Sequence, residues 1–87
     1  MNVEFHPAAL RDVEQAQGWY EERSVFVASA FLRELSTAVR RVRGAPQRYP
    51  LAEAGTRRIG MERFPFTMYY RVQSGVITVV AVAHQKR

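Results

Sequence analysis

The segment "VVAVAHQKR", residues 79–87, places a histidine, an amide and two cations directly after five apolar residues. Such an apolar run predicts a strand, and the polar cluster would then lie at its end. Histidine titrates near neutral pH and can move a proton, and guanidinium groups can hold negative charge that develops on phosphate. A set of this kind would suit the attack of a ribose 2′-hydroxyl on phosphate. The candidates are His84, Arg58 and Arg71 for catalysis, with Tyr69 beside them.

An alternative without catalysis applies to the same residues. A histidine at a strand end also serves as a surface residue or a hydrogen-bonded cap, and His6, which precedes a predicted helix, is expected to cap or pack. The sequence has no cysteine and only two histidines, which argues against disulfides, thiolate sites and a zinc site. It shows no motif for a serine or cysteine triad, a phosphate loop or an EF-hand. We therefore expect no metal or cofactor.

The elements that must position these residues follow from periodicity. "NVEF", residues 2–5, alternates like a short strand, and Pro7 then opens a helix over 7–22 with apolar residues at helical spacing. A second apolar stripe, Phe31 to Val42, predicts another helix between a break near Ser24 and a stop at Gly44 and Pro46. Within the first helix, Leu10 and Trp19 are expected to widen the apolar stripe, and Trp19 and Tyr20 to serve the core. "RRVR", residues 40–43, is expected to be a solvated helix end.

After the Pro- and Gly-rich loop the period changes to two, and we expect strands over 56–62, 65–73 and 76–83. Ser74–Gly75 predicts a tight hairpin, and Pro65 should begin its strand or mark a bulge. The order is β-α-α-β-β-β, an α+β fold in one domain over residues 1–87. A two-helix hairpin would pack on one face of a four-stranded, mainly antiparallel sheet.

Alternation then divides the strand residues between a buried face and an open face. The residues expected under the helices are Ile59, Met61, Phe66, Met68, Tyr70, Val72, Ile77, Val79, Ala81 and Ala83. The open face would carry Arg58, Glu62, Tyr69, Arg71 and His84, with Thr67, Thr78, Val80 and Val82. A register slip of one residue would reverse the assignment of any strand.

Charge is unevenly distributed along the 87 residues, which carry a net charge of +5. Cations and acids balance over residues 1–43, whereas residues 44–87 hold seven Lys or Arg against Glu53 and Glu62 alone. This asymmetry predicts that the second half faces nucleic acid or an acidic protein segment, although a basic surface that only aids solubility is the simpler reading. No apolar run is long enough to span a membrane and no secretion signal is evident, so a cytoplasmic protein is expected.

The segments "FHPAAL", "WYEER", "RRIGMERFPFTMYYRV" and "VVAVAHQKR", in this order and spacing, together resemble the RelE/ParE superfamily of toxins from bacterial type II toxin–antitoxin systems. The resemblance covers nearly the whole chain. It implies a helical hairpin on an antiparallel sheet, with the first strand beside the last. It also implies a cognate antitoxin whose flexible, often acidic tail wraps the toxin.

The branches of the superfamily imply different functions. The ribosome-dependent ribonucleases resemble this chain in Arg58, Arg63 and His84, but many add lysines near the second strand and a late tyrosine, whereas here the sole lysine is Lys86 and no tyrosine follows Tyr70. The gyrase-inhibiting ParE branch is similar in the "HQ" after the final strand. We favour this branch, with growth inhibition and plasmid stabilisation as its roles. Contacts to target or antitoxin are then expected from Arg57, Arg58, Tyr69, Arg71, His84, Lys86 and Arg87.

Two hypotheses therefore remain: a binding toxin that acts on DNA gyrase, and a ribosome-dependent endoribonuclease that uses His84 and the arginines. A free-standing RNA-binding domain fits poorly, because β-α-α-β-β-β matches neither the RRM nor the double-stranded-RNA module.

Overall fold

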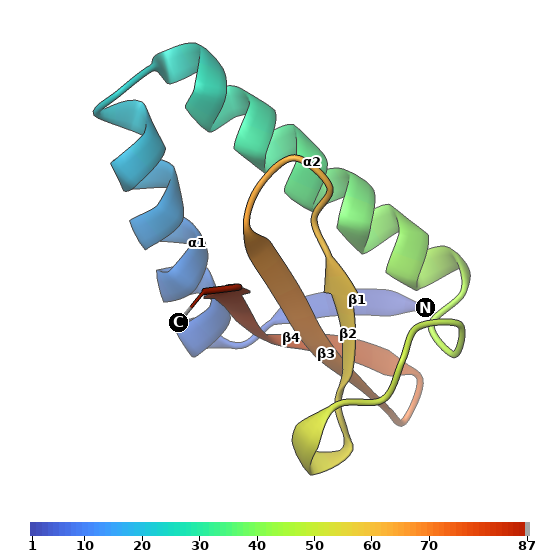
Figure 1. The fold of residues 1–87 in the computed structure, drawn as a ribbon. Helices are drawn as coiled ribbons and strands as arrows, with labels where there is room; N and C mark the ends of the chain where they lie inside the picture. The colour runs from blue at the N-terminus through green and yellow to red at the C-terminus, as the bar shows by residue number, and fades with distance from the viewer. Residues whose placement is uncertain (87) are drawn as a thin grey trace.

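The computed structural model describes residues 1–86, so the expectation for Arg87 lies outside the described residues. Its elements follow the predicted order β-α-α-β-β-β, with one short 3-10 helix, η1, added in the long loop (Figure 1). They are β1 (Asn2–Phe5), α1 (Pro7–Glu21), α2 (Val25–Gly44), η1 (Glu53–Gly55), β2 (Arg57–Gly60), β3 (Phe66–Gln73) and β4 (Val76–His84).

The four strands form one mixed sheet in the order β1-β4-β3-β2. β4 pairs in parallel with β1 and antiparallel with β3, and β3 pairs antiparallel with β2. The first strand therefore lies beside the last, as the resemblance implied. Ser74 and Gly75 connect β3 to β4 with φ angles of 53° and 76°, a left-handed pair that confirms the predicted tight hairpin.

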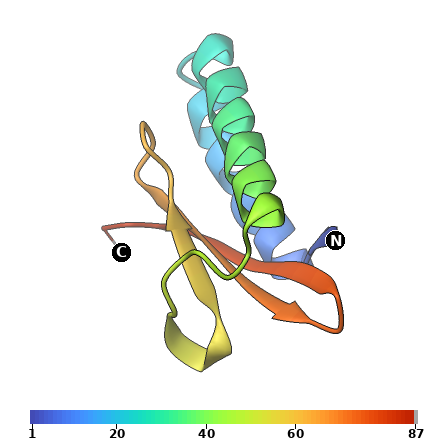
Figure 2. The ribbon, with the colours of Figure 1, turned by 90° about the vertical axis from the view of Figure 1, so that its right-hand side faces the viewer.

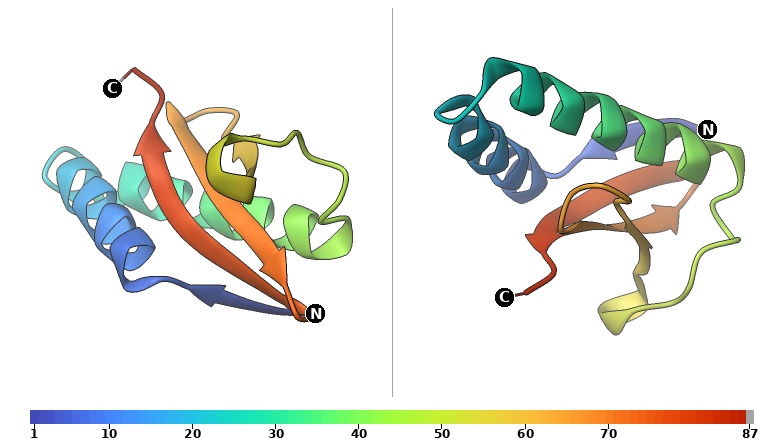
Figure 3. Two further views of the ribbon diagram at one scale, coloured as in Figure 1. Left: turned by 90° about the horizontal axis from the view of Figure 1, so that it is seen from below. Right: turned by 45° about the horizontal axis from the view of Figure 1, so that its top comes forward.

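Both helices cover the same face of the sheet and leave the other face bare (Figures 2 and 3). His6 begins α1 as the predicted cap, because its Nδ1 accepts a hydrogen bond of 3.0 Å from the Ala8 amide. Ser24 begins α2 in the same way through the Val27 amide. The buried side of α2 is the predicted stripe: Phe31, Leu35, Ala38 and Val42.

The α1 stripe is narrower than expected. Ala9 and Ala16 are buried, but Leu10 is 48% exposed and Trp19 is 51% exposed, so the predictions that they widen the stripe and that Trp19 serves the core are wrong. The guanidinium of Arg23 lies 3.4 Å from the centroid of the Trp19 ring and covers one of its faces. Tyr20, by contrast, packs against Phe31 and Phe64 as a core residue.

β2 is shorter than the predicted 56–62, because residues 61–65 form the loop into β3. Within this loop the Arg63 amide donates to a Glu34 carboxylate oxygen at 2.7 Å, and the Met61 amide donates to the carbonyl of Phe66. Pro65 was predicted to begin its strand and stands one residue before β3, where its carbonyl accepts the Gln85 amide at 2.7 Å. Glu62 was expected on the open face but pairs with Arg41 of α2 at 3.8 Å, so that prediction is wrong.

A β-bulge in β4 changes which side its last residues face. Tyr70 lies opposite Val79 and Tyr69 lies opposite Ala81, so Val80 is an extra residue without a partner in β3. Before the bulge, Ile77 and Val79 are buried as predicted. After it, Val82 is the buried residue and pairs with buried Met68, while His84 pairs with Phe66. The predictions that Ala81 and Ala83 are buried, and that Val82 and His84 face outward, are therefore wrong.

The assignment for β3 is confirmed, because Met68 and Tyr70 are fully buried under the helices. The Tyr70 hydroxyl donates a hydrogen bond of 2.7 Å to the carbonyl of Pro46, which ties the long loop to the core. Burial raises the pKa of Tyr70, and the nearby charge of Arg57 opposes that rise.

Candidate functional site

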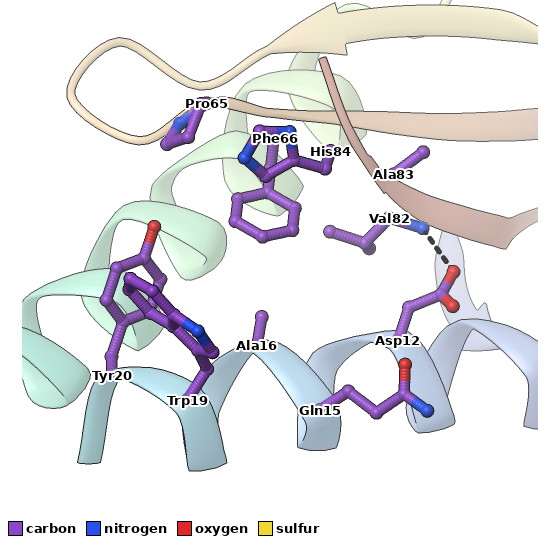
Figure 4. Close-up of a pocket in the computed structure, with 10 residues that line it drawn as sticks. All are labelled: Asp12, Gln15, Ala16, Trp19, Tyr20, Pro65, Phe66, Val82, Ala83 and His84. Carbon is purple, nitrogen blue, oxygen red and sulfur yellow. Dashed lines mark hydrogen bonds between the residues drawn. The ribbon is translucent and has the colours of Figure 1, made fainter. Parts of the chain in front are cut away.

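A cavity of about 400 Å³ opens between α1 and the ends of β3 and β4 (Figure 4). Its α1 wall consists of Asp12, Gln15, Ala16, Trp19 and Tyr20, and its sheet wall consists of Pro65, Phe66, Val82, Ala83 and His84. The volume falls in the range of sites for small ligands or single large side chains. Aromatic rings and small apolar residues dominate the walls, and among residues 1–86 neither lysine nor arginine lines them.

Asp12 fixes the position of β4 against α1. One of its carboxylate oxygens accepts the backbone amide of Val82 at 2.9 Å (Figure 4). The sequence analysis did not select this residue, but a signal was present: Asp12 lies on the helix stripe between Ala9 and Ala16, both buried, where an acid needs a partner.

The edge of β4 beside the cavity has no neighbouring strand. β1 pairs with β4 only from Val76 to Val79, and the last backbone bond on that side runs from His6 to the carbonyl of Val79. Because the Val82 amide points to α1, the backbone of His84, two residues on, faces the same side. Within residues 1–86 the edge from Val80 to His84 thus has no strand beside it, and α1 meets it at Val82 through Asp12.

His84 lies on the helix side of the sheet, at the cavity. Its ring meets Phe66 edge to face with centroids 5.2 Å apart, and its Nδ1 accepts the Lys86 amide at 3.1 Å. With Nδ1 accepting, a neutral ring carries its proton on Nε2. Lys86 itself is exposed after the end of β4.

The bare face of the sheet carries the other predicted contact residues. Arg58 lies directly across from Tyr69 in the β2–β3 ladder, and Arg71 follows Tyr69 by two residues on the same strand. Arg58 and Arg71 are exposed and Tyr69 is half-buried. These three side chains share one face, as predicted, and Figure 3 (left) shows β3 and β4 in front of α2 from this side.

Two predicted arginines have structural partners instead. Arg63 binds Glu34 of α2, with Nε 3.1 Å from a carboxylate oxygen. Burial raises the pKa of Glu34, but the hydrogen bonds from the backbone and side chain of Arg63 outweigh this and hold the pKa below its usual value. Arg57 reaches toward the long loop and donates to the carbonyl of Tyr49 at 2.7 Å and to Gln47.

The four catalytic candidates therefore do not meet on one surface. Arg58 and Arg71 lie on the bare face, His84 lies at the cavity on the helix side, and Arg63 is bound to α2. In residues 1–86 no group of three or more His, Asp or Glu side chains is close enough to hold a metal ion. Neither helix in this part of the chain is long and apolar enough to cross a membrane.

Comparison with known proteins places this geometry in a family. A family model described as "ParE toxin of type II toxin-antitoxin system, parDE" matches residues 3–87. The chain belongs to the ParE toxin family. The chromosomal ParDE toxin–antitoxin system from P. aeruginosa contains a similar fold, with a TM-score of 0.82 and 18% identity over 97% of this chain and 95% of that chain. No curated protein sequence matches the chain. The ParE family lies within the RelE/ParE superfamily that the sequence indicated.

Proposed function

We propose that this ParE-family chain inhibits growth by binding DNA gyrase and is neutralised by a cognate antitoxin. The observation that carries the proposal is the separation of the nuclease candidates: a general acid or base must reach the reacting proton, yet His84 and the arginines of the bare face lie on opposite sides of the sheet. A binding surface needs no such convergence. The family match and this geometry support a binding toxin over a ribonuclease.

Beyond Val82, whose amide is held by Asp12, the edge of β4 offers a means of capturing the antitoxin. An extended segment can add a strand to an unpaired edge, where main-chain hydrogen bonds provide affinity and pockets for alternate side chains provide specificity. The edge from Val80 to His84 lies beside the cavity, which has room for one large apolar side chain. Acidic residues of the same segment would then meet Lys86 and the cations of the bare face. We therefore expect a large apolar residue flanked by acids in the antitoxin segment.

Substitution of Trp19 tests whether the antitoxin binds at the cavity. Trp19 is half-exposed at the cavity, so Trp19→Ala should preserve the fold and weaken antitoxin binding by about 30-fold, the effect of losing an aromatic anchor. Phe26→Ala is the matched control, because Phe26 is an aromatic residue with 86% exposure that does not line the cavity. Titration of purified antitoxin measures both. Equal losses in the two variants would exclude the cavity as the antitoxin site.

The salt dependence of antitoxin affinity distinguishes a contribution from charge from a contribution from apolar contacts. The chain has a net charge of +5, and its exposed cations would attract acidic residues of the antitoxin. Salt screens this attraction, so the affinity for the antitoxin should fall as the salt concentration rises. The titration is repeated at low and high salt. Equal affinity under both conditions would mean that apolar contacts dominate.

The target is tested by expressing the chain without antitoxin while following two readouts, supercoiling by gyrase and cleavage of ribosome-bound transcripts. We expect supercoiling to fail while transcripts stay whole. His84→Ala should reduce toxicity only by the loss of a contact, whereas a general acid or base contributes about 10²–10⁴-fold in rate. Transcript cleavage that precedes any gyrase defect and disappears in His84→Ala would establish the ribonuclease instead.

A further inference from the structure

The outward side of α2 forms a second basic surface, separate from the bare face of the sheet. From Ser29 to Gly44, every exposed residue of this helix is serine, arginine or glycine. Arg33, Ser36, Thr37 and Arg40 are spaced by three, four and seven residues, so they lie on one side of the helix, opposite the buried stripe of Phe31, Leu35, Ala38 and Val42. We call these four residues the α2 arginine face.

Hydroxyl groups on this face hold one of the arginines in place. Arg40 donates to the Ser36 hydroxyl at 3.3 Å and to the Thr37 hydroxyl at 3.2 Å. The guanidinium therefore lies along the helix, back toward Arg33, instead of extending into solvent. A guanidinium oriented by hydroxyl groups loses less conformational entropy when it binds an anion.

The positive charge of the face is not neutralised by the chain itself. α2 carries four arginines and one acid, Glu34, which is bound by Arg63. Within residues 1–86, Arg33, Arg40 and Arg43 take part in no ion pair, whereas Arg41 pairs with Glu62 at 3.8 Å. Arg43 flanks the face in the last turn of the helix, where its positive charge also interacts favourably with the negative end of the helix dipole.

The residue types exposed on α2 indicate which kind of anionic partner the α2 arginine face fits. A protein partner needs apolar anchors, and the exposed apolar residues of α2 are confined to its first turn, with Phe26 two turns before Arg33. Single-stranded nucleic acid needs aromatic rings on which bases stack, and residues 29–44 expose none. Arginine, serine and threonine are among the residues that contact phosphate groups of duplex DNA. Arg33 and Arg40 are about 10 Å apart along the helix axis, a span that covers several phosphates of one strand.

We propose that the α2 arginine face, with Arg43, binds the phosphate backbone of double-stranded DNA without reading its sequence. This proposal goes beyond gyrase and antitoxin binding and does not depend on either of them. The DNA-binding surface on α2 is separate from both the bare face of the sheet and the cavity.

The test measures binding of the purified chain to a fluorescently labelled DNA duplex of about 20 base pairs by anisotropy, over salt concentrations of about 50–200 mM. Three phosphate contacts predict a slope of about −2.7 for log K against log salt. Arg33→Ala with Arg40→Ala should reduce this slope in magnitude by about 1.8 and weaken binding at low salt by at least about tenfold. Both side chains are exposed, so thermal unfolding should be unchanged.

Arg58→Ala with Arg71→Ala is the matched control, because it removes the same charge from the bare face. Retention of the wild-type slope in this control, together with its loss in the α2 variant, supports the proposal. Equal losses in both variants would show attraction by net charge alone and overturn it. The proposal would also be overturned if single-stranded DNA bound as tightly as the duplex. It would be overturned too if no binding were detected at low salt, or if a polyglutamate peptide bound the α2 arginine face and the duplex did not. The supercoiling assay is separate, so failure of the gyrase proposal leaves this result readable.

Discussion

The two halves of β4 share one strand but differ in their neighbours. From Val76 to Val79 the strand lies between β1 and β3, with Ile77 and Val79 fully buried. From Val80 to His84 it has β3 on one side only, and a single amide is fixed to Asp12 on the other. One extra residue, Val80, separates the halves. The paired half holds the sheet together, and the open half, Val80 to His84, borders the cavity that we propose for the antitoxin.

The comparison shows that one strand can have different neighbours along its length. A bulge changes the direction of the strand and the face of every later side chain, at the cost of one unpaired residue. The following changes test how far the two halves differ, from the largest expected effect to the smallest.

Ile77→Ala tests the paired half. Ile77 has no exposed surface and lies under the helices, so its truncation should lower the free energy of unfolding by about 2–5 kcal/mol. Denaturant titration measures the loss. Thr78→Ala, on the opposite face of the same strand, should cost less than about 1 kcal/mol. Similar losses for the two variants would mean that this half of β4 is not packed as described.

Asp12→Ala tests how the open half is held. The Val82 amide would lose its acceptor beside a buried side chain, which should cost about 1–3 kcal/mol of unfolding free energy. Asp12→Asn keeps an acceptor oxygen and should cost clearly less. Hydrogen exchange at Val82 provides a local readout, with faster exchange expected in the alanine variant. Unchanged exchange would show that the Asp12 bond does not restrain the edge.

Tyr70→Phe tests a contact of the residue in β3 that pairs with Val79, at the end of the paired half of β4. Loss of its bond to Pro46 should lower the free energy of unfolding by about 0.5–1.5 kcal/mol. Burial raises the pKa of Tyr70, so its contribution is fully present below the unfolded-state pKa of about 10 and is lost as pH rises through the folded-state pKa. The difference between wild type and variant should therefore shrink in alkaline denaturation curves. A constant difference would argue against this assignment.

Glu34→Gln tests the loop that leads to Phe66, the partner of His84. The lowered pKa of Glu34 means that its contribution is present above the unfolded-state pKa and is lost as pH falls through the folded-state value. The variant should be slightly less stable than wild type at neutral pH and equal to it in acid. Thermal unfolding across pH measures this. Arg63→Ser is a control that removes the guanidinium but keeps the backbone amide that donates to Glu34, so it should show the same pH pattern with a smaller loss of stability.

Much of the fold followed from the sequence because its signals are local. The apolar stripe of α2, the cap at His6 and the Ser74–Gly75 turn each depend on a few neighbouring residues, and each was predicted. Alternation also placed Arg58, Tyr69 and Arg71 on one face, because β2 and β3 are regular.

The site was predicted less well because its geometry depends on contacts between distant segments. The residues around Val80 are apolar on both sides of the bulge, so alternation could not reveal that an extra residue moves His84 to the helix side. Arg63 was a catalytic candidate because of the resemblance to the ribonuclease branch, and its ion pair with Glu34 could not be predicted because the two residues lie far apart in the sequence. The half-exposed Trp19 likewise depends on Arg23 and on the end of α1.

The position of β4 between β1 and β3 has a consequence for the order of folding. The helical hairpin requires only contacts between neighbouring segments, but β1 has no strand partner until the last strand of the sequence is in place, where Asn2 meets Val76. Closing so long a loop is entropically costly and slows the rate of folding. We therefore expect α1 and α2 to form early and the cavity last, since one of its walls is β4. A chain that is still being synthesised would carry the helices but not yet the surface that an antitoxin is proposed to recognise.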